Sequence, residues 1–304
     1  MKDISGMENK AYYHLPGLFE FYEFYKVFLP LFNGKREYFY DWCDIGSIYG
    51  APADILWGGG RIELNDTDMG QVFRLMNDNK ISARLALSNS FIRKEHLNDE
   101  KANKLCRIFH HGSVKNGIII HSDLLLDYLR EKYPDYYFVS STTKVLTDFN
   151  DLKNELDREE FSFVVPDFRL NKEFDSLSEL SKEEKNKIEF LCNECCSFEC
   201  ANRKACYESV SKKILGEESS DWVCVSRNAA EGYKFSKAME NKAFISVSDI
   251  KDKYIPMGFS NFKIEGRSLG SAILLEFIIY YMTKPEYALK LREEMYLDSM
   301  LDLF

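Results

Sequence analysis

The sequence predicts an α/β fold, a closed (β/α)8 barrel of the TIM type. Short apolar or β-branched runs recur along most of the chain, and amphipathic helical segments separate them. This order is typical of βα units that build a parallel sheet. Eight or nine such runs in 304 residues favour a closed barrel over an open doubly wound sheet. No GxGxxG fingerprint follows the first run, so a dinucleotide-binding sheet has little support.

The expected elements alternate along the chain. Most strand candidates are short and do not alternate strictly, as is typical of strands covered on both faces. The candidate strands span residues 53–57, 81–87, 117–120, 137–139, 161–165, 188–192, 222–225, 244–247 and 262–264. The candidate helices span residues 68–77, 99–109, 123–132, 152–159, 248–254 and 269–282, and another amphipathic helix follows to the end.

The amino-terminal region is expected to be helical. Residues 18–31 are rich in aromatic side chains, spaced so that most of one side of a helix would be buried. A membrane-surface helix would need a basic polar face, but Lys26 is the only Lys or Arg between Leu18 and Pro30. We expect residues 1–40 to form a helical extension packed on the barrel. The whole chain, 1–304, is then a single TIM-barrel-like domain.

Composition and charge narrow the class of protein. Hydrophobic residues make up 45% of the chain and charged residues 29%, which is ordinary for a soluble globular protein. The net charge of −9 disfavours broad electrostatic binding of nucleic acid, although it is compatible with a local basic pocket. The longest apolar run, 272–282, contains Glu276 and is too short to span a bilayer. Without a recognisable signal peptide, we expect a cytoplasmic protein with no membrane span.

Cysteine clustering is the most unusual feature of the chain. Five of the eight cysteines lie between residues 192 and 206, directly after the strand candidate 188–192. In a reducing compartment such clustering favours metal binding over disulfides. A loop at the carboxyl end of a barrel strand is also where ligands and chemistry are found. Cys43 and Cys106, which lie outside the cluster, are expected to be ordinary buried thiols.

An iron–sulfur cluster is the favoured use of these thiols, since it needs three or four thiolates that converge. We expect Cys196, Cys200 and Cys206 to be ligands, with Cys224 as the fourth from the end of the next strand candidate. Cys192 and Cys195 are expected in spare or buried roles. Zinc is the alternative metal, although the second closely spaced cysteine pair of a typical zinc site is absent. A site without metal also stays open.

Two motifs resemble a known family. The segment LCNECCSFECANRKACY (191–207) resembles VNExCxxxCPxRxxHY, a hallmark of peptidase family U32, the collagenase-like peptidases. The segment MGFSNFKIEGR (257–267) is similar to the family's second mark, a turn into a strand ending KIEGR. Weaker similarity covers residues 53–61, 81–89 and 116–129. The family's paired cysteines fall on Cys196 and Cys200 and its arginine on Arg203, whereas Ala201 and Cys206 replace its usual proline and histidine.

The resemblance implies a TIM-barrel-like fold and, as in several members, an oxygen-sensitive [4Fe-4S] cluster. Those members act in oxygen-independent hydroxylation of a quinone precursor or of RNA bases, and others are described as peptidases. We therefore expect an iron–sulfur-dependent oxidoreductase or hydroxylase that modifies a small or aromatic substrate. The alternatives are a U32-type peptidase or hydrolase, and a non-catalytic accessory subunit that docks with a protein partner or homologous subunit. The sequence does not identify the substrate or the electron donor.

Four further residues are candidates for catalysis or substrate binding. Glu265 and Arg267 follow the last strand candidate, where Arg267 could bind a carboxylate or phosphate, unless the two side chains only satisfy each other. Alternation places Lys263 and Glu265 on one side of that strand. Arg61 follows three glycines whose backbone can approach a ligand closely, and His121 ends the strand 117–120. A serine hydrolase or zinc protease has no direct support, because no nucleophile elbow or HExxH is present.

Overall fold

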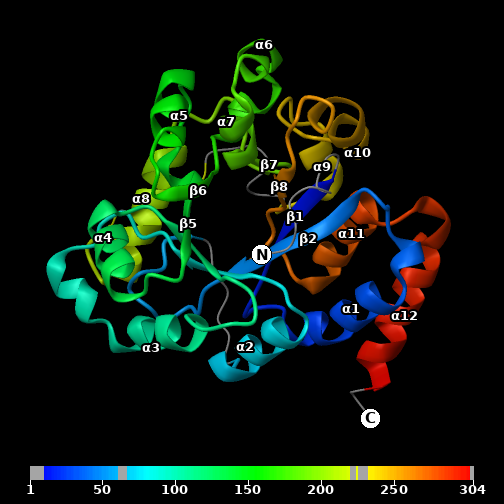
Figure 1. The fold of residues 1–304 in the computed structure, drawn as a ribbon, viewed down its shortest axis with the longest axis horizontal. Coiled ribbons are helices and arrows are strands. Elements are labelled where there is room, and N and C mark those ends of the chain that lie inside the picture. The colour runs from blue at the N-terminus through cyan, green and yellow to red at the C-terminus, as the bar shows by residue number, and fades with distance from the viewer. Residues whose placement is uncertain (1–9, 61–66, 220–223, 225–231, 302–304) are drawn as a thin grey trace.

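The strands form one parallel sheet that curls into a barrel surrounded by helices (Figure 1). The computed structural model describes residues 10–60, 67–219, 224 and 232–301, and eight strands lie within these ranges. Their order in the sheet is β6-β5-β4-β3-β2-β1-β8-β7. The two edge strands meet through a parallel bridge between Val164 and Ile188. The sheet therefore closes in chain order, which confirms the predicted α/β (β/α)8 fold.

The elements alternate as βα units over most of the chain. The strands are β1 (Ala11–Pro16), β2 (Cys43–Gly50), β3 (Ala83–Leu87), β4 (Gly117–Ile120), β5 (Tyr137–Ser140), β6 (Phe161–Val164), β7 (Glu189–Leu191) and β8 (Asn261–Lys263). The α-helices are α1 (Tyr22–Gly34), α2 (Met69–Asp78), α3 (Glu100–Phe109), α4 (Asp123–Lys132), α5 (Phe149–Leu156), α6 (Phe174–Ser178), α7 (Lys182–Lys187), α8 (Arg203–Ile214), α9 (Phe235–Met239), α10 (Val247–Asp249), α11 (Ser271–Met282) and α12 (Ala288–Leu301). A π-helical turn, Ile250–Tyr254, continues α10.

Side-chain caps fix where several barrel helices begin. The Asp68 carboxylate accepts a hydrogen bond from the Gln71 backbone N–H at 2.9 Å, which starts α2. Asp99 caps α3 in the same way, and Ser122 and Asp148 cap α4 and α5. Such caps satisfy backbone N–H groups that have no partner within the helix. They explain why the predicted starts of α2, α3 and α4 agree with the structure to within one residue.

The first two strands of the barrel correct the sequence prediction. Residues 1–40 were expected to be a helical extension, but β1 lies within them and pairs in parallel with both β2 and β8. The predicted first strand, 53–57, is instead a run of turns, and β2 precedes it. The signal of β2 is weak because it contains Asp44 and three small residues. Gly46 is required there, since a Cβ atom would lie 2.6 Å from the His14 ring.

Two later strand predictions also differ from the structure. Residues 244–247 form no strand; Ile245 is buried at the end of β7, where its N–H donates to the Cys192 carbonyl at 3.0 Å. The Tyr281 hydroxyl donates to the Ile245 carbonyl at 3.1 Å. The segment is apolar because it is covered by α11, not because it extends the sheet. The predicted strand 222–225 lies outside the described residues, apart from Cys224.

The amino-terminal aromatic segment forms α1 and packs on the body, as predicted. Tyr25, Phe28 and Leu29 are fully buried, and the Phe28 ring lies edge-on to Phe39 with centroids 6.0 Å apart. Helix α1 also contacts α12 near the end of the chain, and the two lie side by side in Figure 1. None of the helices within the described ranges has the length and apolar character needed to cross a bilayer.

Charged side chains lie in the middle of the barrel. Glu189 is fully buried; its carboxylate forms an ion pair with Arg84 and accepts a hydrogen bond from Lys263 Nζ at 3.0 Å. His14 Nε2 lies 3.5 Å from the same carboxylate, and its Nδ1 lies 2.8 Å from Ser47 Oγ. Burial and the Arg84 charge lower the pKa of His14 to about 3, so this imidazole is neutral at pH 7.

Candidate functional site

A cavity opens at the carboxyl ends of the strands, in the mouth of the barrel. Its volume is about 70 Å³. The lining side chains come from the ends of six strands and the loops that follow them, and include Tyr49, Ser88, Ile119, Thr143, Leu191 and Glu265. Parallel strands deliver their carboxyl ends to one face of a barrel, which is where TIM-barrel enzymes place their chemistry. The mouth cavity is therefore the first candidate for a substrate site.

Two cations and two carboxylates line this mouth cavity; the carboxylates belong to Glu194 and Glu265. Arg267 and Lys263 both line it, together with the ring of Tyr49. Lys263 Nζ lies 3.8 Å from the Tyr49 ring centroid, and the Tyr49 hydroxyl donates to the Ile264 carbonyl at 2.7 Å. Arg267 Nη1 is buried and has no hydrogen-bond partner among the described residues. Such a group costs free energy unless a ligand satisfies it, so the cavity suits an anionic group.

The glycines before Arg61 serve this arrangement. A Cβ atom on Gly60 would lie 1.9 Å from Arg267 Nη2, and one on Gly59 would lie 2.2 Å from the Ser88 carbonyl oxygen. Gly59 therefore packs against the Ser88 backbone and Gly60 against the Arg267 guanidinium. A side chain at Gly60 would occupy the space that the guanidinium fills. Arg61 itself lies outside the described residues.

Asn193 joins the two strand ends that carry the cysteine loop and Glu265. Its Oδ1 accepts from the Glu265 backbone N–H at 2.8 Å, and its Nδ2 donates to the Glu265 carbonyl at 3.2 Å. Asn193 is fully buried, so these bonds replace water for both backbone groups. The Glu265 carboxylate in turn accepts from the Cys195 N–H at 3.3 Å. No ion pair joins Glu265 to Arg267 in the described part of the chain.

Glu194 and Arg203 form a buried ion pair behind the cysteine loop. Arg203 Nη1 contacts Glu194, and Arg203 Nε lies 3.4 Å from Asp167 Oδ2. All three side chains are at most 3% exposed. Burial raises the pKa of Asp167, whereas the Arg203 charge opposes that rise. Glu194 Oε1 also accepts from the Cys196 N–H at 3.0 Å, so the pair fixes the backbone of the loop. These contacts give a structural reason for the Glu and Arg positions of the sequence motif.

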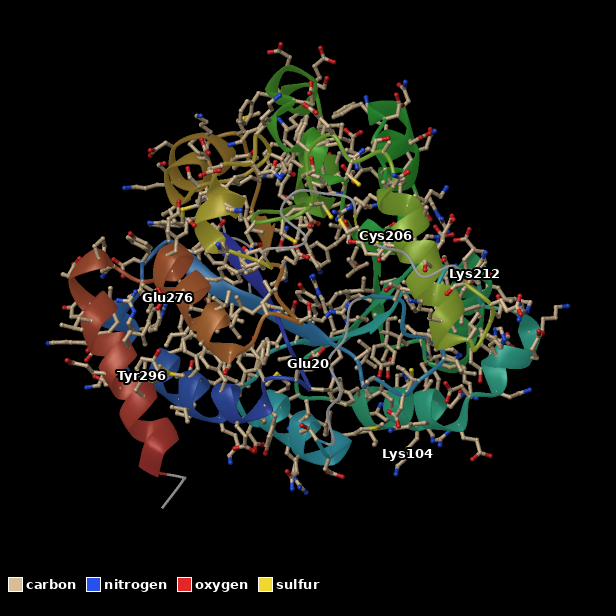
Figure 2. The ribbon with its side chains drawn as sticks, turned by 180° about the vertical axis from the view of Figure 1, so that it is seen from behind. Glu20, Lys104, Cys206, Lys212, Glu276 and Tyr296 are labelled. Carbon is tan, nitrogen blue, oxygen red and sulfur yellow. The ribbon has the colours of Figure 1, made fainter. Side chains whose placement is uncertain are left out.

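Four cysteines line a second, larger pocket of about 620 Å³ beside the mouth. They are Cys195 and Cys196 after β7, Cys206 on α8 and Cys224. Figure 2 labels Cys206 on its helix. Glu194 lines both this cysteine pocket and the mouth cavity, so the two hollows share a wall. The tertiary structure thus brings together thiols from three separate segments of the chain.

Three of the four cysteines that were expected to bind a cluster line the cysteine pocket. Cys196, Cys206 and Cys224 line it, but Cys200 does not. The loop turns there: the Cys200 N–H donates to the Ser197 carbonyl at 3.0 Å, and Arg169 donates to the Cys200 carbonyl at 3.2 Å. Cys195 takes the remaining place in the lining, although the sequence analysis gave it a spare or buried role.

The other described residues singled out in the sequence, among them three cysteines and His121, line neither hollow. Cys43, Cys106 and Cys192 are fully buried, which confirms the first two as core thiols. His121 follows β4, and its Nδ1 lies 2.8 Å from Thr143 Oγ1. Burial, helped by the Lys144 charge, lowers the pKa of His121 to about 4. His121 lines neither the mouth cavity nor the cysteine pocket, so contact with a ligand in either hollow has no support here.

Sequence reasoning missed the residues that hold the site from beneath. Lys263 was placed on the correct side of β8, but its partner Glu189 and the neighbouring Arg84 were not identified. Burial lowers the pKa of Lys263 to about 8, and the Glu189 carboxylate opposes that fall. Lys263 can therefore gain or lose a proton near neutral pH at the floor of the mouth. The only sequence signal was the charge of Glu189 in an otherwise apolar run.

Comparisons with known proteins agree with the fold. No protein-family model and no curated protein matches the sequence. A solved structure described as a U32 peptidase, Mk0906, superimposes with a TM-score of 0.52 at 11% sequence identity. The match covers 85% of this chain and 94% of that chain. At that identity the likeness concerns the backbone alone. This chain therefore has the (β/α)8-barrel fold seen in a U32 peptidase.

Proposed function

We propose that the cysteine pocket holds a [4Fe-4S] cluster and that the protein acts in oxygen-independent redox or hydroxylation-type modification of a small anionic or aromatic substrate. One observation carries the proposal: Cys195, Cys196, Cys206 and Cys224 line a single pocket, although they come from separate segments. Such a cluster needs three or four cysteine thiolates, and this pocket offers four thiols.

The surroundings of the pocket suit an anionic cluster. Lys234, Lys237 and Lys242 line it beside the four cysteines. Glu194, Glu199 and Glu240 line the same pocket, so the lysines offset the carboxylates around a bound anionic cluster. At about 620 Å³ the pocket also has room for more than a single ion. When bound, the cluster supplies one-electron transfer or activation of a bound group.

The neighbouring mouth cavity supports the choice of substrate. Arg267 offers a buried Nη1 with no partner among the described residues, and Lys263 adds a second positive charge. The Tyr49 ring lies against Lys263 and gives the cavity an aromatic wall. In this proposal Arg267 and Lys263 bind and orient the anionic group, and the shared Glu194 wall places the substrate next to the cysteine pocket.

The test is the metal content of protein purified without oxygen. We expect iron and acid-labile sulfide in comparable amounts, visible charge-transfer absorption, and an EPR signal on reduction. Cys206→Ala and Cys224→Ala are each expected to lose most of the iron. Cys106→Ala, which removes a core thiol of α3, is the control and is expected to keep it. Wild-type protein without iron or sulfide, or full iron content in both pocket variants, would contradict the proposal.

The same preparations decide the ligand set. Because Cys200 lies outside the pocket lining and Cys195 within it, Cys195→Ala is expected to lower the iron content and Cys200→Ala to leave it unchanged. The reverse result would restore the set suggested by the motif resemblance.

A metal-dependent hydrolase is the second candidate function, and one observation favours it. Ligand atoms of Glu194, Cys195 and Glu265 all lie within 4.8 Å of one another, a mixed set of carboxylate and thiolate that suits zinc. A site with three protein ligands leaves a position for water, as in zinc peptidases. However, the Arg203 guanidinium already pairs with Glu194 and competes with a cation there. We therefore prefer the iron–sulfur cluster hypothesis.

Zinc and iron analysis of one preparation separates the two functions. The hydrolase predicts one zinc per chain, peptide hydrolysis in air, and loss of that activity after chelation. In that case Glu265→Gln would lower zinc content, whereas Cys206→Ala would not, because Cys206 is not part of the three-residue group.

A further inference from the structure

A third hollow lies at the opposite end of the barrel from the cysteines. Its volume is about 1120 Å³, and residues at the amino ends of the strands line it. They include Tyr12 of β1, Gly46 of β2, Arg84 of β3, Tyr137 of β5 and Asn261 of β8. We call this hollow the amino-terminal mouth. It shares no lining residue with the cysteine pocket and none with the mouth cavity at the carboxyl end.

The rim of the amino-terminal mouth is basic, against the charge of the whole chain. Lys10, Lys115, Lys182 and Lys185 line it, and they come from three different parts of the barrel's circumference. No Asp or Glu is among the lining residues within the described chain, although the protein carries a net charge of −9. Lys10 and Lys115 form no ion pair with a described carboxylate. Their charges are therefore available to a ligand.

The walls below the rim are apolar and aromatic. Tyr12, Tyr137, Phe163 and Phe259 all contribute to the lining. Arg84 forms part of the floor; its guanidinium lies 4.5 Å from the Phe163 ring centroid, and its Nε donates to the Tyr137 hydroxyl at 2.8 Å. A planar body would be covered by the rings, and an acidic group would reach the lysines at the rim.

We propose that the amino-terminal mouth is a second small-molecule site, which binds a planar or aromatic molecule carrying one acidic group. The shape selects the class of ligand, since ligand pockets combine apolar walls with a few placed polar groups. The lysines of the rim favour a negatively charged ligand. This site is independent of the proposed cluster, because none of its residues lies at the carboxyl face.

A pair of fluorescent probes tests the proposal on the full-length protein. One is 8-anilinonaphthalene-1-sulfonate, a planar anion, and the other is N-phenyl-1-naphthylamine, its uncharged counterpart. The double variant Lys10→Gln/Lys115→Gln is expected to weaken binding of the anion by about tenfold, because two charges that line the hollow are lost. Binding of the neutral probe is expected to change by less than about twofold. The same loss of charge at two exposed lysines of α3 and α12, Lys104→Gln/Lys290→Gln, is the control and should affect neither probe, because neither helix contributes to the lining.

A third variant locates the binding. Met257→Trp enlarges a lining side chain in the turn before β8 and is expected to abolish binding of both probes while circular dichroism stays unchanged. The proposal is overturned if a folded Met257→Trp protein binds the anion as wild type does. It is also overturned if the rim variant and the surface control weaken the anion equally, since that result shows general electrostatic attraction and not a site.

Discussion

The buried carboxylate of Glu189 holds two cations in the middle of the barrel, so its neutralisation should be costly. Arg84 pairs with it, and Lys263 Nζ lies 3.0 Å from Oε1. Glu189 is fully buried, Arg84 is 1% exposed and Lys263 4% exposed. Glu189→Gln keeps the shape of the side chain and removes only the charge. Breaking a buried pair by removing one partner costs about 3–5 kcal/mol, because the other charge is left uncompensated.

The protonation of Lys263 adds a pH dependence to that loss. Its pKa is lowered to about 8 in the folded protein, against an ordinary value of 10.5. The unfolded chain therefore binds more protons between these values, and the wild type gains stability as pH rises from 8 to 10.5. In Glu189→Gln the pKa of Lys263 should fall further, because the carboxylate that opposed the fall is gone, and a fall of one unit costs about 1.4 kcal/mol at pH 7. Above pH 8 both proteins hold Lys263 neutral, so this part of the difference disappears.

Urea unfolding at pH 7 and pH 9, followed by circular dichroism, measures both effects. We expect Glu189→Gln to lose about 3–5 kcal/mol of unfolding free energy at pH 7, and the gap to wild type to narrow by about 1.4 kcal/mol at pH 9. Glu159→Gln removes an exposed carboxylate and should change stability by less than about 0.5 kcal/mol. A loss below about 1 kcal/mol, or a gap that does not change with pH, refutes the reasoning.

Three other predictions follow from the same contacts. His14 has a folded pKa of about 3 against 6.5, so the stability that it contributes above pH 6.5 is lost as pH falls towards 3. His14→Gln removes this titration. Between pH 7 and pH 4 the variant should therefore lose about 3 kcal/mol less unfolding free energy than the wild type, measured by urea unfolding. Parallel pH curves for the two proteins would contradict this. Asn193→Ala leaves two backbone groups of Glu265 without partners and should cost about 1–3 kcal/mol in the same assay; a cost no larger than that of exposed Asn154→Ala would argue against the clamp. Gly60→Ala places a methyl group where Arg267 Nη2 lies, so binding of inorganic phosphate, measured by calorimetry, should weaken about fivefold or more. Gly34→Ala, with no atom within 4 Å of the added Cβ, is its control, and equal phosphate affinity in both variants would show that Arg267 does not bind the anion.

Local sequence signals were enough to predict the barrel and most of its elements. The strand 117–120 and the helix 123–132 have the predicted bounds, because an apolar run and a Ser cap mark them within the segment itself. The cysteine loop was likewise placed correctly at the carboxyl end of β7. Strands β1 and β2 were missed because His14, Pro16 and Gly46 are uncommon in strands. His14 is needed for contacts inside the barrel, and Gly46 leaves room for its ring.

The composition of the site depends on contacts that no local pattern contains. Arg84 and Glu189 are 105 residues apart and meet only because the sheet closes. Which of the clustered thiols faces the pocket is decided by the turn at Cys200 and by the Glu194–Arg203 pair, so Cys195 replaces Cys200 in the lining. The sequence by itself determined the order of βα units and the supply of thiols, because both depend on local hydrophobicity and spacing. Only the tertiary structure decided which charges are buried together and which thiols line the same pocket, because barrel closure places those segments.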